Sequence, residues 1–101
     1  MKTIKYSELC EKLGKFIRVE NLDSRNGCGK APNQFELTFE NGFVMQSYNS
    51  IIGAKIDGQY YFTNYHDYSN TTSSHCTRWC MYNCKERRKG LENEKFIFIE
   101  M

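Results

Sequence analysis

Two turn dipeptides constrain the fold of this chain more than any other feature. Alternating apolar and polar residues over 34–40 lead into an Asn-Gly pair at 41–42, and an Asp-Gly pair at 57–58 joins two further apolar runs. Both dipeptides are preferred in two-residue β-hairpins. The sequence therefore predicts a meander of antiparallel strands. In the second hairpin we expect one face to carry Ile52, Ala54, Ile56 and Tyr61.

The first hairpin has a definite expected register. With the turn centred on the Asn-Gly pair, Glu40 pairs with Phe43, and Leu37 lies opposite Gln46. Gln46 is then a polar amide on an apolar face, where an unpaired buried amide costs about 1–3 kcal/mol. We expect this amide to bond to the segment at 67–69.

The segment before the meander contains a short helix, a strand and a long loop. Apolar residues at helical spacing predict the helix over 6–13, and Gly14 ends it. Residues 15–21 read as a strand. Residues 23–33 are rich in turn formers and predict the one long loop.

The segment after the meander predicts a longer helix and a last strand. Residues 75–89 contain no Gly or Pro, and Gly90 follows as a helix stop. The candidate N-caps of this helix are Thr71, Thr72 and Ser73. The apolar run at 95–99 is typical of a strand covered on both faces.

These elements indicate the α+β class. Strands grouped together with helices near the ends predict one domain over 1–101, with an antiparallel sheet of about five to six strands. A short N-terminal helix and a longer helix before the last strand pack on that sheet. Parallel strand pairs are not expected.

Charge excludes two classes of protein. The net charge is +2. An acidic mimic of nucleic acid needs a large negative charge, and a histone-like coat needs a large positive one. Basic and acidic residues number seven and four over 1–30, one and four over 31–70, and six and four over 71–101. The meander is therefore acidic between two basic ends.

The N-terminal residues lack the apolar run of a signal peptide, and no stretch reaches the roughly 20 apolar residues of a membrane span. We expect a cytoplasmic protein without a membrane partner, whose five cysteines are free thiols.

The cysteines near the C-terminus have two interpretations. Cys76, Cys80 and Cys84 fall on one stripe of the expected helix, next to His75, and Cys28 or His66 could complete a zinc shell. Alternatively, the three thiols are the buried face of the helix. We predict that the chain binds neither a metal nor a cofactor. No nucleophile has a positioned base, so we expect no enzymatic activity.

Three groups of residues are candidate partner contacts: the loop cations, the basic end of the longer helix, and the tyrosines of the meander. They are Arg25, Lys30, Tyr60, Tyr65, Tyr68, Lys85, Arg87, Arg88 and Lys89. Cations at a helix C-terminus also have a simple structural role, because the helix dipole favours them there. Tyrosine is enriched at protein contacts, which gives the third group its functional interpretation.

A further set of residues resembles a small domain of unknown function found in phage and mobile-element proteins. The resemblance covers about residues 32–80 and rests on the patterns NQF, QSYxSII and DYSxTT. Its motif residues are Asn33, Gln34, Gln46, Ser47, Tyr48, Asp67, Ser69, Thr71 and Thr72. These motif residues have two interpretations, a structural scaffold that needs no ligand or a binding site.

The resemblance implies a phage or mobile-element setting inside a bacterial host. We expect a small inhibitor of a host defence machine, of the anti-CRISPR kind, that binds a CRISPR nuclease or complex stoichiometrically. A nucleic-acid-binding accessory module using the basic helix end is one alternative, and a zinc-binding structural domain is another. A second copy of the chain is a further candidate partner.

Overall fold

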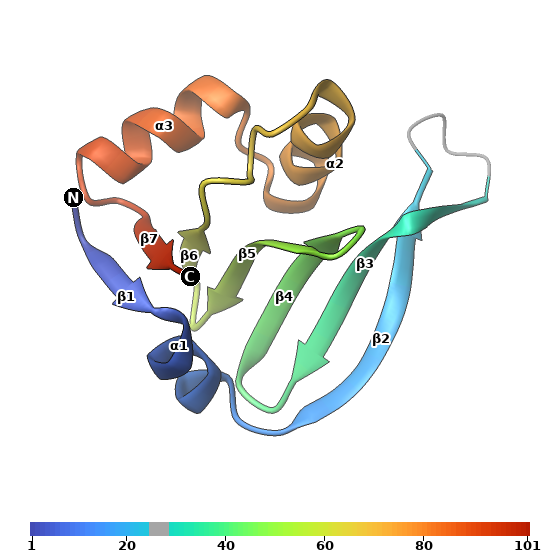
Figure 1. Cartoon of the computed structure of the whole chain (residues 1–101), viewed down its shortest axis with the longest axis horizontal. Helices are drawn as coiled ribbons and strands as arrows, with labels where there is room; N and C mark the ends of the chain where they lie inside the picture. The colour runs from blue at the N-terminus through green and yellow to red at the C-terminus, as the bar shows by residue number, and fades with distance from the viewer. Residues whose placement is uncertain (25–28) are drawn as a thin grey trace.

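The computed structural model describes residues 1–24 and 29–101 of the chain. Within these residues the α+β class is confirmed, with three helices and one seven-stranded sheet in the order β1-β7-β6-β5-β4-β3-β2 (Figure 1). The elements are β1 (Thr3–Lys5), α1 (Tyr6–Leu13), β2 (Phe16–Asp23), β3 (Lys30–Phe39), β4 (Gly42–Ser47), β5 (Ser50–Ile56), β6 (Gln59–Phe62), α2 (Asn70–Cys80), α3 (Cys84–Glu92) and β7 (Ile97–Glu100).

The sheet is mixed, so the purely antiparallel prediction is wrong. Strands β2 to β6 form the expected antiparallel meander. Strand β7 then pairs parallel to β6, and β1 pairs parallel to β7. The reason is the helical connection through α2 and α3, because a crossover of this length returns the chain to the end of the sheet where β6 began.

The turn of the first hairpin is centred one residue earlier than its Asn-Gly pair predicts, which moves each cross-strand partner by two positions. Phe39 pairs with Gly42, and Leu37 lies opposite Val44. Gly42 is needed inside the strand, because a Cβ there would lie 2.3 Å from the Lys55 carbonyl oxygen of β5. The change of partner is even, so the apolar residues keep the predicted face.

The second hairpin has the predicted turn, with Asp57 at φ 50° and Gly58 at φ 79°. Its predicted apolar face is wrong at one position. Met45 pairs with Gly53 and Gln46 with Ile51, so Ile52 is the extra residue of a β-bulge. The bulge turns Ile52 away from the face that carries Ala54.

Two apolar cores lie on opposite faces of the sheet. On one face, Leu9 and Leu13 of α1 pack against Val44 and Ala54. On the other face, α2 and α3 cover the strands (Figure 1). The residues of this second core are Met45, Ile52, Phe62, Cys76, Cys80, Leu91 and Phe96.

The single long helix predicted over 75–89 is wrong. Helix α2 ends at Cys80 and is followed by Met81 with φ 69°, and Asn83 then begins α3 with a capping box to Glu86. Gly90 lies inside α3, where a Cβ would meet the Phe96 ring at 2.2 Å.

The start of α2 and the start of β3 also correct the sequence-based boundaries. The N-cap of α2 is Ser69, whose Oγ accepts from the Thr72 amide at 3.1 Å, and none of the three candidate caps. Strand β3 already begins at Lys30, so residues 30–33 belong to the sheet and not to the loop. In the described part of the chain, no helix is long and apolar enough to cross a membrane.

Candidate functional site

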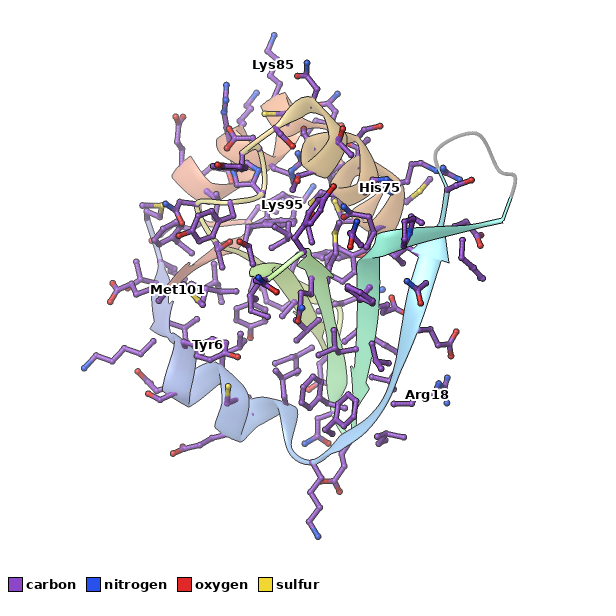
Figure 2. The ribbon with its side chains drawn as sticks, turned by 45° about the vertical axis from the view of Figure 1, so that its right-hand side comes forward. Tyr6, Arg18, His75, Lys85, Lys95 and Met101 are labelled. Atoms are coloured by element: carbon purple, nitrogen blue, oxygen red, sulfur yellow. The ribbon has the colours of Figure 1, made fainter. Side chains whose placement is uncertain are left out.

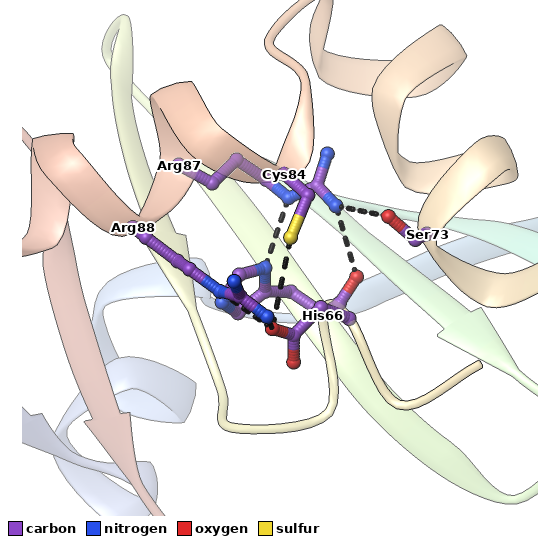
Figure 3. Close-up of polar contacts among 6 residues, drawn as sticks. His66, Ser73, Cys84, Arg87 and Arg88 are labelled. Carbon is purple, nitrogen blue, oxygen red and sulfur yellow. Dashed lines mark hydrogen bonds and ion pairs between the residues drawn. The ribbon is translucent and has the colours of Figure 1, made fainter. Parts of the chain in front are cut away.

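A buried arginine of α3 holds the segment between β6 and α2. Arg87 is 0% exposed, and its Nε donates to Nδ1 of His66 at 2.9 Å while its Nη2 donates to the His66 carbonyl oxygen at 3.1 Å (Figure 3). Its other bonds go to Ser73 Oγ, Thr77 Oγ1 and the Tyr82 carbonyl oxygen. All five N–H groups are therefore donated, which allows a guanidinium to be buried.

The prediction that Arg87 contacts a partner is therefore wrong. The helical spacing of Cys84, Arg87 and Leu91 places Arg87 on the inward stripe of α3. That spacing is the available signal in the sequence, and the nearby cations Lys85, Arg88 and Lys89 obscure it.

Asp67 provides a second anchor for the same segment. Arg88 Nε donates to Asp67 Oδ2 at 2.9 Å, and the Cys84 thiol lies 3.7 Å from the same oxygen (Figure 3). Burial acts to raise the pKa of Asp67, but the hydrogen bond and the charge of Arg88 lower it overall. Asp67 is thus held as a carboxylate.

His66 is neutral in this arrangement. Burial lowers its pKa from 6.5 to about 4, with Asp67 opposing the shift and Arg87 and Arg88 adding to it. Because Nδ1 accepts a hydrogen bond from Arg87, the ring proton lies on Nε2. A proton on Nδ1 would remove the acceptor and place a second cation beside the buried guanidinium.

The same segment between β6 and α2 carries two exposed tyrosines. Tyr65 and Tyr68 are 37% and 78% exposed, with ring centroids 6.2 Å apart, and Tyr48 from the β4–β5 turn is 58% exposed. We call these three residues the tyrosine surface. They border a hollow of about 160 Å³ whose remaining lining consists of Ser47, Ser50, Ile52, Ser69 and Thr72. None of these lining residues carries a charge.

Motif residues position Tyr48, which has φ 53° and so lies in the left-handed region. Its amide donates to the Asn33 carbonyl oxygen at 2.7 Å, and Gln46 Nε2 donates to its carbonyl oxygen at 2.7 Å. The Gln46 amide thus bonds within its own turn, and the predicted bond to 67–69 is wrong. Such strained positions persist where the surroundings enforce them, and they often mark functional segments.

The remaining motif residues connect this turn to α2. Ser47 Oγ and Thr72 Oγ1 are 3.1 Å apart, and Ser69 Oγ caps the helix. Thr71 is exposed at the start of α2. Gln34 is buried opposite Ser47, and its Oε1 has no hydrogen-bond partner among the described residues.

The other predicted contacts do not join the tyrosine surface. Tyr60 is half-buried and packs edge-on against Trp79 and Tyr82, so it has a packing role, and its contact with a partner stays a prediction. Lys30 pairs with Asp23 at 2.8 Å. Arg25 lies outside the described residues.

The four cations predicted at the basic helix end differ in their exposure and pairing. Lys85 and Lys89 are exposed in the first and last turns of α3, but Arg87 between them is buried and Arg88 is paired with Asp67. The predicted run of four cations is therefore not a continuous surface.

The cysteines of interest are split between two helices. Cys76 and Cys80 are buried in α2, whereas Cys84 begins α3, so the single stripe expected from the sequence is absent. The contact with Cys80, together with burial, raises the pKa of Cys76. Among the described residues, no group of three His, Cys, Asp or Glu side chains could hold a metal ion. Cys28 lies outside those residues.

The fold and its site define an α+β scaffold in which the segment before α2 carries two residues of the tyrosine surface and is held by the buried Arg87. The chain belongs to DUF8033, a family of unknown function, which it matches over residues 14–96. This range contains the meander, both helices of the crossover and the whole tyrosine surface. No curated protein and no solved structure gives a significant match.

Proposed function

We propose that this protein is a non-catalytic binding protein that contacts a protein partner through the tyrosine surface. The partner we propose is a host-defence effector such as a CRISPR nuclease, which the protein inhibits stoichiometrically in the bacterial cytoplasm. One observation carries the binding role: Tyr48, Tyr65 and Tyr68 border one uncharged hollow while remaining 58%, 37% and 78% exposed.

The chemistry of this surface suits a protein partner. Tyrosine offers a large, stiff contact area with a hydroxyl at its edge, and it is enriched among residues that dominate binding energy. Nucleic-acid binding draws most of its affinity from Lys and Arg contacts with phosphates, and the lining contains neither residue type. A protein side chain that enters the hollow would find apolar walls and several hydroxyl groups.

The surface is also pre-organised. Arg87 fixes His66, and Arg88 fixes Asp67, so the backbone between Tyr65 and Tyr68 is anchored from α3. Binding then has little loop entropy to overcome, because the segment is already ordered before the partner arrives.

The choice of a defence effector rests on the resemblance to phage and mobile-element domains. The QSY and DYS patterns that carry this resemblance contribute Tyr48 and Tyr68. The same residues therefore support both the setting and the surface.

The test is co-purification and inhibition with candidate effector nucleases. Tyr68→Ala and Tyr65→Ala are each expected to weaken binding by tenfold or more, which corresponds to about 1.4 kcal/mol. Tyr6→Ala is the matched control, because Tyr6 is 38% exposed and lies in α1 on the opposite face. Failure to bind any effector would remove the proposed partner, and unchanged binding by both variants would remove the tyrosine surface.

The nucleic-acid alternative is weaker on this geometry. Of its four cations, Arg87 is buried and Arg88 is paired, which leaves Lys85 and Lys89. Nuclease treatment before the co-purification distinguishes the two functions, because a nucleic-acid-mediated complex would be lost.

A further inference from the structure

Strand β2 is a long and uncovered sheet edge. It contains eight residues, and among the residues that the structure describes only β3 pairs with it, along one side. Phe16, Ile17 and Val19 are 53%, 56% and 53% exposed. An edge of this kind presents unpaired N–H and C=O groups to any strand that approaches it.

One part of this edge is regular. Register shifts against β3 occur between Phe16 and Arg18 and between Asn21 and Asp23. Between them, residues 18–21 pair without interruption with residues 35–38. This stretch can accept another strand, whereas the bulges on either side limit how far the pairing extends.

The charges of this stretch are self-complementary about Val19. If a second β2 pairs antiparallel with the first and Val19 lies opposite Val19 of the second copy, Arg18 lies opposite Glu20 of that copy, and the reverse contact forms as well. The neighbouring symmetric registers, centred on Arg18 or Glu20, place like charges opposite each other, which is unfavourable. The charge pattern therefore selects one register.

The side chains are arranged for this pairing. Arg18 Nε and Glu20 Oε1 are 2.7 Å apart within one chain, so both side chains lie on one face, and they are 61% and 62% exposed. Figure 2 shows Arg18 on the outer side of β2, away from the helices. Val19 is on the other face, beside Leu37.

We propose that β2 binds β2 of a second copy of this chain, extending the sheet across a twofold axis at Val19. The pairing buries Val19 at the twofold axis, and it allows the ion pair within each copy to be exchanged for ion pairs between the copies. This interface is separate from the tyrosine surface, so it stands or falls independently of the proposed function.

The test is a charge exchange followed by sedimentation equilibrium of the full chain. Wild type is expected to reach twice the 12.0 kDa monomer mass as its concentration rises. Arg18→Glu and Glu20→Arg each place like charges opposite each other in the selected register, and each is expected to weaken self-association by at least tenfold. An equimolar mixture of the two variants is expected to associate again, because both acidic positions of one variant then face both basic positions of the other.

Two controls make the result specific. Lys85→Glu makes the same charge change as Arg18→Glu on exposed α3, far from β2 (Figure 2), and should associate like wild type. Circular dichroism confirms that the variants are folded. A monomeric wild type, normal association of both single variants, or a mixture that stays monomeric would each overturn the proposal.

Discussion

The neutral state of His66 predicts that this fold begins to lose stability as the pH falls below about 6.5, before most carboxylates titrate. In the folded protein the pKa of His66 is about 4, because burial disfavours its charged form. In the unfolded chain it returns to about 6.5. Between these values the unfolded state binds a proton that the folded state does not bind, so the free energy of unfolding falls as the pH falls.

The magnitude follows from the two pKa values. A shift of one unit corresponds to about 1.4 kcal/mol, so the full loss approaches about 3 kcal/mol near pH 4. At about pH 5 the loss relative to neutral pH is about 2 kcal/mol. This is a large part of the stability of an ordinary small domain, which is about 5–15 kcal/mol.

The assay is urea unfolding followed by the fluorescence of Trp79, the sole tryptophan, at about pH 7.5 and about pH 5. The comparison variant is His66→Asn, since its side-chain oxygen can accept the Arg87 bond at the position of Nδ1 but does not titrate. The variant loses ring packing against Phe62, so it is less stable at neutral pH. Its stability should nevertheless change about 2 kcal/mol less between the two conditions than that of wild type.

The buried His75 is present in both proteins, so its contribution cancels in this difference. An equal pH dependence in wild type and His66→Asn would refute the reasoning. It would mean that His66 is not held neutral by its burial beside Arg87.

Three further predictions concern local structure. Ser69→Ala should lower the free energy of unfolding by about 1 kcal/mol through loss of the α2 cap, measured by urea titration, and Ser69→Asp should largely restore it. Gly90→Ala should cost about 1–3 kcal/mol by forcing the Phe96 ring from its place, seen as a lower melting temperature. Gly42→Ala should accelerate amide hydrogen exchange in β4 and β5, because its Cβ would push the Lys55 backbone away; unchanged exchange would contradict the close approach.

The features that the sequence predicts correctly are those that depend on neighbours along the chain. The helix over 6–13 and the Asp57-Gly58 turn follow from spacing and from residues that favour positive φ. The first hairpin shows where this reasoning stops. Its Asn-Gly pair is a strong turn signal, but Gly42 is required by the approach of β5, a contact between strands that local sequence does not encode.

The candidate site divides in the same way. The exposure of Tyr65 and Tyr68 follows from composition, because a tyrosine-rich meander has to leave some tyrosines at the surface. The role of Arg87 does not follow from it, because burial of a guanidinium depends on acceptors from three separate segments. The hydrogen-bond partners of Gln46 likewise follow from the conformation of the turn and not from residue type.

The parallel pairing of β1 with β7 has a consequence for how the protein is made. Thr3 lies opposite Phe98, so a strand near the start of the chain pairs with a strand near its end. A ribosome must release β7 before β6 gains its outer neighbour and before β1 finds any neighbour in the sheet. The antiparallel meander can assemble earlier, because its contacts are local. The pairing of β1 with β7 joins distant parts of the chain and is a late and slow step. A nascent chain arrested before residue 97 should therefore carry an ordered meander and an undocked N-terminal strand.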